Sequence, residues 1–418
     1  MKKIVINHIN KIEGHAGMEA NILNGKILKA RMEVKEGVRL IEGILIGRPI
    51  EEASLITARI CGLCPAVHCI TASKALEAAL KIKIPEPIVN LRKIMLNGQI
   101  IQSHALHILM ASSDYLGLGN SLDLMSKHSA AFQNIIKIRE FGNELIETIG
   151  GRSVHPMSAN IGGFLKAPNQ EKLKKLLEKQ PEILASAIDL SDWFEKIKIN
   201  KFSRKTEFVA LKNNKEYAIY EGDISSSEKL SISAQKYNSG LIEFQRASEI
   251  INMVKRNQQP YLVGPLARLN IAGNKLNKNA RQTMKKLKLD LPCYNTFHNL
   301  TAQMIEIIHL IEETQKLLQK HLKSKNKIYR VSYKIKAGYG VGACEAPRGL
   351  LIHAYQIDNQ GKIVKANIIT PTAQFLFNLE KDLETFIPSL KKLSPNQKRK
   401  KIEMLVRAYD LCISCAVH

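Results

Sequence analysis

Apolar and polar side chains alternate along residues 1–35, which is the pattern of strands with one buried face. The turn-forming sequence Asn24-Gly25-Lys26 interrupts the alternation, so we expect a β-hairpin there. Two later segments, residues 205–235 and 328–370, also have the composition of short strands and turns. Within the second, Asn359-Gln360-Gly361 predicts another hairpin turn.

Elsewhere the apolar positions recur every three or four residues, which predicts long amphipathic helices. The periodic ranges are residues 88–112, 127–149, 169–197, 241–256, 276–287 and 298–323. Pro49 and Pro65 each stand where a further helix would begin, because proline is favoured in the first helical turn. A last helix, capped by Ser394 and beginning at Pro395, is expected to end at about Tyr409.

Helical ranges dominate this pattern, so we expect a mainly α fold (α+β): a long-helix bundle with small antiparallel β-sheets. No internal repeat and no linker-like stretch divides the sequence. We therefore expect residues 1–418 to form a single domain in which the N- and C-terminal segments meet.

The composition excludes several classes of protein. Hydrophobic residues make up 45% of the chain and charged residues 24%, which does not fit a disordered protein. The net charge is +24, but the basic stretches lack interleaved aromatic residues, so we expect no nucleic-acid binding. The basic surface is solvated or faces an acidic partner. We expect no membrane span, because no apolar run reaches ~18 residues, and a cytoplasmic location, because the first residues do not resemble a signal peptide.

The cysteines change this picture. There are seven, an odd number that does not suit a disulfide framework. Four of them form two Cys-x-x-Cys pairs, in "RICGLCPAVHC" (59–69) and "CISCAVH" (412–418). About 350 residues separate the pairs, whereas zinc ribbons separate theirs by ~15–20 residues. A four-cysteine site for zinc or iron, built by the tertiary fold, remains open.

The residues around the pairs favour a tuned metal site. His68 follows Cys64 by four residues, one helical turn, so its ring can reach back to the sulfur. Arg59 and Asp410 each precede the first cysteine of a pair by two residues, and charged groups so placed can orient thiolates. Four thiolates form a soft donor set that can hold nickel as well as zinc.

With these motifs in view, the chain resembles the large, catalytic subunit of nickel–iron hydrogenases. The family motif R-x-C-G-x-C-x-x-x-H matches "RICGLCPAVH", and D-P-C-x-x-C-x-x-H matches "DLCISCAVH" except for Leu411. "KIEGH" (11–15) resembles R-I-E-G-H with Lys11 for arginine, and "RLIE" (39–42) resembles R-G-x-E with Leu40 for glycine. "EAPRGLLIHAY" (345–355) and "ITPTAQ" (369–374) match as well, although Phe375 stands where relatives often have asparagine.

The resemblance implies the metal ligands. Cys61 and Cys412 would be terminal nickel ligands, and Cys64 and Cys415 would bridge nickel to an iron that also binds carbon monoxide and cyanide. His68 would donate to a bridging sulfur.

The resemblance also implies the surroundings of the metals. Arg348 would lie over the metals beside Asp114, which would hold its guanidinium group, and Arg348 and Thr372 would donate to the cyanides. The wall around the diatomic ligands would consist of Ala346, Pro347, Leu351 and Pro371.

The same resemblance implies a proton-relay residue and a site for a second kind of metal. Glu13 would be the first proton relay, a role that a carboxylate can fill when burial raises its pKa. Magnesium would bind the Glu42 carboxylate, the Ile368 carbonyl and the His418 ring, with water completing the octahedron.

The sequence most resembles the cytosolic enzymes coupled to pyridine nucleotides, including the sulfhydrogenase type. Such a subunit would cleave dihydrogen heterolytically and pass electrons to an iron–sulfur small subunit. A flavin subunit and a further iron–sulfur subunit would complete the path to NAD(P), because the chain has no dinucleotide-binding glycine motif. Three alternatives stay open: a hydrogen sensor, a structural subunit of a proton-pumping complex, and a zinc-stabilised scaffold.

Overall fold

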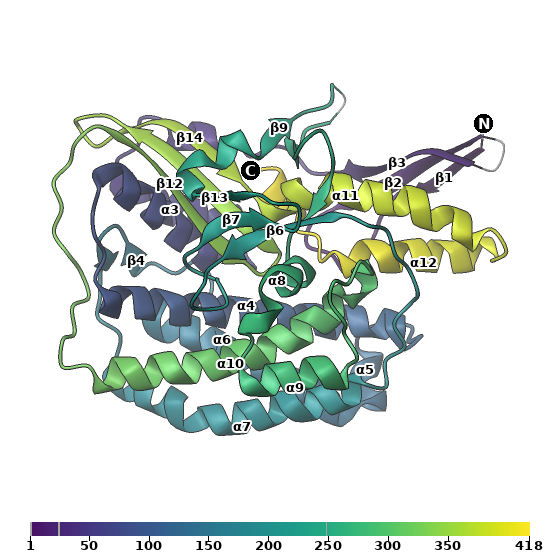
Figure 1. The fold of residues 1–418 in the computed structure, drawn as a ribbon, viewed down its shortest axis with the longest axis horizontal. Helices are drawn as coiled ribbons and strands as arrows, with labels where there is room; N and C mark the ends of the chain where they lie inside the picture. Colours follow the sequence, from purple (N-terminus) through teal and green to yellow (C-terminus); the bar gives the residue numbers. More distant parts are fainter. Residues whose placement is uncertain (1, 24–25, 248) are drawn as a thin grey trace.

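Four long helices pack against one another in the lower half of the view in Figure 1. They are α4 (Glu86–Tyr115), α6 (Ser129–Gly150), α7 (Gln170–Phe194) and α10 (Asn299–Lys323). The computed structural model describes residues 2–23, 26–247 and 249–418. In the packing order, α4 contacts α6, α6 contacts α7, α7 contacts α10, and α10 returns to α4. The predicted long-helix bundle is therefore present. None of the helices in the described ranges is long and apolar enough to span a membrane.

Local sequence signals set several helix ends. The Asn169 side chain accepts from the backbone N–H of Lys172 at the start of α7, as an N-cap does. Ser394 and Gln397 form a capping box at the start of α12 (Pro395–Ala408), where a helix is predicted. The helices predicted near Pro49 and Pro65 are α2 (Ile50–Thr57) and α3 (Pro65–Leu80).

The predicted β segments form three separate sheets. One is the antiparallel meander β1 (Lys2–Ile6), β2 (Ala16–Leu23) and β3 (Lys26–Val34), although residues 24–25 of the predicted turn lie outside the described residues. The second is antiparallel β12 (Gly338–Ala346), β13 (Gly349–Ile357) and β14 (Ile363–Ile369). The third has the order β11-β6-β7-β8, in which β11 (Tyr261–Leu262) runs parallel to β6 (Glu207–Lys212), next to β7 (Asp223–Ser226) and β8 (Ser231–Ile232).

Shorter elements connect these layers. They are α1 (Ile41–Leu45), α5 (Asp123–Lys127), α9 (Lys278–Lys286), α13 (Ile413–Ala416), β4 (Ala159–Asn160), β5 (Gly163–Phe164) and 3-10 turns at Ala58–Ile60, Ala234–Ser239, Gly273–Lys275, Thr296–His298 and Ile387–Leu390.

One predicted helix is wrong, and two helices of eight or more residues in the described ranges were not predicted. Residues 241–256 instead contain β9 (Ile242–Phe244) and β10 (Met253–Lys255), an antiparallel pair in which β10 packs on α11. Short β-branched runs fit either structure, and tertiary packing decided here. The unpredicted helices are α8 (Pro265–Ala272) and α11 (Pro371–Phe386), each with proline in its first turn.

A close backbone contact places the turn between β12 and β13 relative to α3. Gly338, Gly340 and Gly342 of β12 lie directly on α3, where a Cβ atom would approach the carbonyl oxygens of Ala79, Ala75 and Thr71 to within 2.3, 2.2 and 2.5 Å. Only glycine permits this approach. The contact holds the β12–β13 turn near the start of α3. Cys64 directly precedes α3, and His68 lies in its first turn.

Candidate metal centre

The two cysteine pairs come from opposite ends of the chain and meet in the interior. Cys61 follows the 3-10 turn Ala58–Ile60, and Cys64 directly precedes α3. Cys412 directly precedes the short helix α13, and Cys415 lies within it. Figure 1 marks the C-terminus in the upper part of the view, between β14 and α11. The final helix α13 lies in the interior, because most of its residues are buried.

The four sulfur atoms form one compact group. Cys61 Sγ lies 3.3 Å from Cys412 Sγ, Cys64 Sγ lies 3.3 Å from Cys415 Sγ, and the sulfurs of Cys412 and Cys415 are 3.0 Å apart. All four lie within 4.8 Å of one another and are buried. The convergence of the two pairs, predicted from the sequence, is therefore observed, and the remaining three cysteines lie outside the group.

The close thiols hold their protons unequally. Hydrogen bonds from Cys412, Cys415 and Cys64 lower the pKa of the Cys61 thiol well below its usual range. Burial, together with its sulfur neighbours, raises the pKa of the Cys412 thiol well above it. Cysteine binds metals as the thiolate, so a cation among the four sulfurs would displace the remaining protons.

Arg348 lies beside the sulfurs but its partner is Asp410, not Asp114. Its Nη2 donates to Asp410 Oδ1 at 2.8 Å and its Nε donates to the Asp410 carbonyl at 2.7 Å. Burial opposes the charge, but the Asp410 carboxylate raises the pKa of Arg348 well above its usual range. Nη1 is buried and has no hydrogen-bond partner among the described residues, so it is available to a group bound at the sulfurs.

The predicted contact between Asp114 and Arg348 is wrong. Both carboxylate oxygens of Asp114 accept from Arg407 Nη1, at 3.0 and 2.9 Å, and Oδ1 also accepts from Lys11 Nζ at 3.2 Å. Two cations from other elements, α12 and the segment before β2, therefore neutralise Asp114. The fold instead brings Asp410, two residues before Cys412, against Arg348.

His68 lies where the sequence predicts, against the group of sulfurs. Its Nε2 is 3.8 Å from Cys415 Sγ, the length of a weak hydrogen bond to sulfur. Burial lowers the pKa of His68 to about 3, so the ring is neutral. Its Nδ1 lies 3.1 Å from Nε2 of His353, a residue that sequence reasoning did not single out.

Thr372, predicted to donate to the cyanides, contacts the second cysteine motif. The Thr372 hydroxyl accepts from the backbone N–H of Cys412 at 3.2 Å, which leaves its own proton free to donate elsewhere. The four predicted wall residues lie at the β12–β13 turn, on β13 and at the first turn of α11, and all are buried: Ala346, Pro347, Leu351 and Pro371.

Glu13 touches one of the four sulfurs. Its Oε2 lies 3.1 Å from Cys412 Sγ and accepts from the backbone N–H of Ser414 at 3.0 Å, while the Ser414 hydroxyl donates to Oε1. Glu13 also forms a backbone bridge with Cys412, because its N–H donates to Leu411 and its carbonyl accepts from Ile413. The carboxylate is thus fixed beside the sulfur, and it is partly exposed.

The predicted magnesium ligands also come together. His418 Nε2 lies 2.8 Å from the Ile368 carbonyl oxygen and 3.9 Å from Glu42 Oε1. Glu42 Oε1 accepts from the Ile368 backbone N–H at 2.6 Å. Burial raises the pKa of Glu42 and lowers the pKa of His418.

The comparisons with known proteins decide the family. Residues 39–142 and 160–418 match the family model described as nickel-dependent hydrogenase. The chain belongs to the nickel-dependent hydrogenase family. The sequence-based identification as a hydrogenase large subunit, and hence as an oxidoreductase, is confirmed.

Individual relatives align with this chain over nearly their full lengths. This hydrogenase subunit is 32% identical to subunit alpha of sulfhydrogenase 1 from Pyrococcus furiosus, over 99% of the chain and 97% of the relative. It is 30% identical to subunit alpha of sulfhydrogenase 2 from the same organism, over 99% and 98%. A crystal structure of an NAD+-reducing nickel–iron hydrogenase in the H2-reduced state matches with a TM-score of 0.88 and 26% identity, covering 100% of both chains. The predicted fold class is thus confirmed.

Arg39 is a further residue of the hydrogenase site whose role could not be read from its motif alone. Arg39 donates to the carbonyls of Arg59 and Ile60, at 3.4 and 2.5 Å, and also to the Ser414 carbonyl. A single guanidinium group therefore joins the 3-10 turn before Cys61 to helix α13, which carries Cys415. The arginine of the R-x-x-E motif at residues 39–42 was the available signal.

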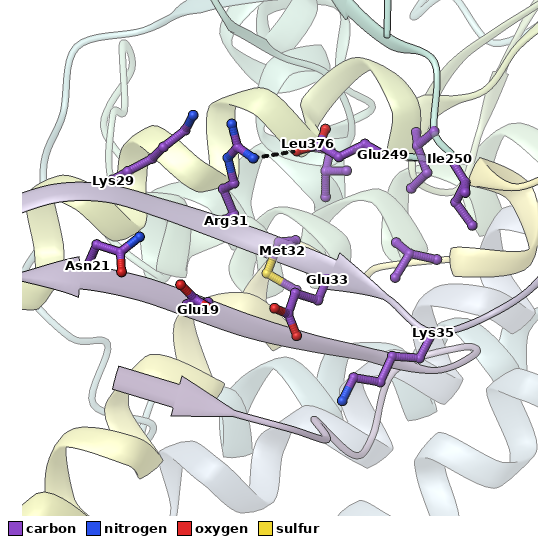
Figure 2. A pocket seen from close by; sticks show the side chains of 12 residues that line it. Glu19, Asn21, Lys29, Arg31, Met32, Glu33, Lys35, Glu249, Ile250 and Leu376 are labelled. Carbon is purple, nitrogen blue, oxygen red and sulfur yellow. Dashed lines mark ion pairs between the residues drawn. The ribbon is translucent and has the colours of Figure 1, made fainter. Parts of the chain in front are cut away.

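The large surface pocket in Figure 2 lies away from the sulfurs. It has a volume of about 620 Å³ and is lined by β2, β3 and the segment before β10, with charges of both signs, such as Arg31 and Glu249, whose side chains lie 3.8 Å apart. Its walls include none of the predicted site residues. This hydrogenase site is therefore a buried group of side chains rather than an open pocket.

Proposed function

We propose that this subunit catalyses reversible heterolytic cleavage of dihydrogen to protons and electrons. The observation that carries the proposal is the buried group of four sulfurs with the Glu13 carboxylate 3.1 Å from Cys412 Sγ. When bound among the sulfurs, a nickel–iron group with carbon monoxide and cyanide on iron polarises dihydrogen so that it splits heterolytically. The soft donor set and the unpartnered Nη1 of Arg348 suit such a group.

Different side chains would bind different parts of the nickel–iron group. Cys61 and Cys412 would bind nickel, and Cys64 and Cys415 would bridge it to iron. The Nη1 of Arg348 and the Thr372 hydroxyl would donate to the cyanide ligands, because both have a donor left over. His68 would donate to a bridging sulfur. The buried apolar wall would exclude water, which strengthens the electrostatic interactions inside.

The proton would leave through Glu13. Its carboxylate is within hydrogen-bond reach of Cys412 Sγ, and the Ser414 backbone and hydroxyl hold it in that position. Geometry of this kind is the first requirement for a proton acceptor. Partial exposure of Glu13 provides the outward connection to solvent.

We also propose a magnesium ion held by the Glu42 carboxylate, the Ile368 carbonyl and the His418 ring. The three groups already converge, and water molecules would complete an octahedron. Magnesium would replace the direct contacts among them and fix the segment that carries Cys415. Isothermal titration with magnesium should show binding that Glu42→Gln weakens, and equal binding by both proteins would contradict this site.

The electrons would pass to partner subunits. The pyridine-nucleotide-linked type is supported by two likenesses, to sulfhydrogenase alpha subunits and to an NAD+-reducing enzyme. We infer an iron–sulfur small subunit, a flavin/NAD(P) diaphorase subunit and a further iron–sulfur subunit, all in the cytoplasm. Residues 1–418 would act in this complex as one domain, because residue 13 and residues 412–415 share one site.

Hydrogen-dependent viologen reduction by the purified complex, together with its nickel content, tests the proposed function. Cys412→Ser should lose nickel and activity, because it replaces a soft ligand with a hard one. Cys293→Ser is the matched control, since Cys293 lies outside the four sulfurs and is only half-buried. Retention of nickel and activity by Cys412→Ser, or equal losses in both variants, would contradict the proposal.

Glu13→Gln separates proton transfer from metal binding. Because the amide keeps the size of the side chain but cannot accept the proton as a carboxylate does, activity should fall ~10²-fold or more. Nickel content should stay unchanged. Full activity in this variant would remove Glu13 from the proton path.

A further inference from the structure

A row of three buried side chains extends from Cys415 into the protein. His68 Nε2 lies 3.8 Å from Cys415 Sγ, and His68 Nδ1 lies 3.1 Å from His353 Nε2. His353 Nδ1 lies 2.6 Å from the hydroxyl oxygen of Tyr355. The exposed fractions are 1% for His68 and 0% for His353 and Tyr355, so bulk solvent does not reach these side chains.

The fold fixes the order of this row. His353 and Tyr355 are two residues apart on β13, so their side chains lie on the same face of the strand. His68 is on α3, which packs against both β12 and β13 (Figure 1). The glycines of β12 that lie on α3 bring this face to the ring of His68.

The hydroxyl group of Tyr355 determines which nitrogen of each ring is protonated. A buried O–H group requires an acceptor, and His353 Nδ1 is the one partner that the hydroxyl has among the described residues. If Tyr355 donates, Nδ1 of His353 has no proton and Nε2 of the neutral ring donates to His68 Nδ1. His68 then carries its proton on Nε2, which faces the sulfur.

The reverse arrangement is disfavoured at the Tyr355 end of the row. If His353 carried its proton on Nδ1, the Tyr355 O–H would have no acceptor within the described part of the chain. His68 would in turn direct a lone pair, rather than a proton, at the sulfur of Cys415. One phenol proton, buried two side chains away, therefore selects the orientation of the whole row.

We propose that Tyr355, acting through His353, is a positioning residue that fixes His68 in the tautomer whose Nε2–H faces the sulfur of Cys415. The effect of this tautomer on a bound metal rests on the proposed function, because the N–H would withdraw charge from a bridging thiolate. The tautomer itself does not rest on it, because the row is complete in the protein alone.

Nitrogen-15 NMR of histidine in the full-length, metal-free chain tests the tautomers directly. The signals of His68 and His353 can be assigned from their loss in His68→Gln and His353→Gln. In the wild-type chain both rings should be protonated at Nε2 and unprotonated at Nδ1. In Tyr355→Phe, His353 should lose this preference and His68 should change with it.

The matched control is Tyr115→Phe, which removes a phenol that donates to the Phe297 carbonyl at 3.1 Å, outside the row. It should leave both rings as in the wild type. Protonation of His353 at Nδ1 in the wild-type chain overturns the proposal, even if Tyr355→Phe fails to fold. Unchanged tautomers in a folded Tyr355→Phe chain overturn it as well.

Infrared spectra of the mature complex give a readout at the metal centre. Tyr355→Phe should shift the carbon monoxide and cyanide bands at unchanged nickel content, and Tyr115→Phe should not. Unshifted bands in Tyr355→Phe would overturn the influence of Tyr355 on the centre. A wild-type complex without such bands would instead contradict the proposed function, and the NMR result would still decide the tautomers.

Discussion

The guanidinium group of Arg348 donates to the Asp410 carboxylate at 2.8 Å and to the Asp410 backbone carbonyl at 2.7 Å. Asp410 lies two residues before Cys412, so this pair connects the β12–β13 turn to the second cysteine motif. Both side chains are only 6% exposed, and the interaction is therefore little screened by solvent. Asp114, the partner expected from the family resemblance, instead neutralises Arg407.

The Arg348–Asp410 pair predicts unequal effects of two aspartate substitutions. Asp410→Asn keeps the shape but leaves a buried guanidinium without its counter-charge, so hydrogen oxidation per bound nickel should fall at least about tenfold, which corresponds to ~1.4 kcal/mol. Asp114→Asn should have a smaller effect, because Arg407 keeps Glu403 as a partner. Equal losses, measured with viologen as acceptor, would contradict this assignment.

The backbone conformation of Leu40 predicts that replacing this residue with glycine stabilises the protein. It has φ 52° and ψ 38°, a left-handed conformation, and its side chain is 66% exposed. The conformation costs an ordinary residue ~1–2 kcal/mol and glycine loses ~0.5–1 kcal/mol of chain entropy, so Leu40→Gly should raise the free energy of unfolding by about 0.5–1 kcal/mol. Ile44→Gly, at an exposed helical position, should lower it. A destabilised Leu40→Gly chain in urea unfolding would refute this explanation.

His309 predicts how stability depends on pH. Burial lowers its pKa to about 4, and its Nδ1 accepts from the backbone N–H of Asn277 at 3.1 Å. Between the unfolded pKa of ~6.5 and the folded value, only the unfolded chain binds the proton. The free energy of unfolding is thus unaffected by His309 titration above pH ~6.5. Below that pH it falls by about 1.4 kcal/mol per pH unit as the pH decreases toward 4.

The matched variant for this pH effect is His309→Asn, which keeps an acceptor near the Nδ1 position but does not titrate. Urea unfolding midpoints measured from pH 7 to pH 5 should decline less steeply for the variant than for the wild-type chain. Parallel declines would mean that other groups, such as His68, account for the dependence.

Periodicity predicted the fold where an element has a strong pattern of its own. The ranges of α7 and α10 agree with prediction to within a few residues, because their apolar stripes extend over many turns. The helix predicted over residues 241–256 is wrong because the periodic run is short and its β-branched residues pack equally well on a strand, here against α11. The helix α11 was missed although Pro371 marks its first turn.

The sequence predicted the four cysteines of the site, but it did not predict all of the side-chain contacts around them. Two Cys-x-x-Cys pairs define a donor set by chemistry alone, and the fold brings their sulfurs within 4.8 Å of one another. The partner of Arg348 depends on which carboxylate the fold brings nearest, and spacing along the chain does not contain that information. Tyr355 could not be predicted for the same reason, since its role depends on two rings contributed by different elements.

An infrared spectrum of the purified, nickel-containing complex, in the region of metal-bound carbon monoxide and cyanide, tests the central claim most directly. If the four sulfurs hold a nickel–iron group, the spectrum should contain bands of both ligands, and Cys412→Ser should abolish them while Cys293→Ser keeps them. A spectrum without such bands from fully processed, nickel-replete protein would contradict the hydrogenase mechanism proposed for this chain.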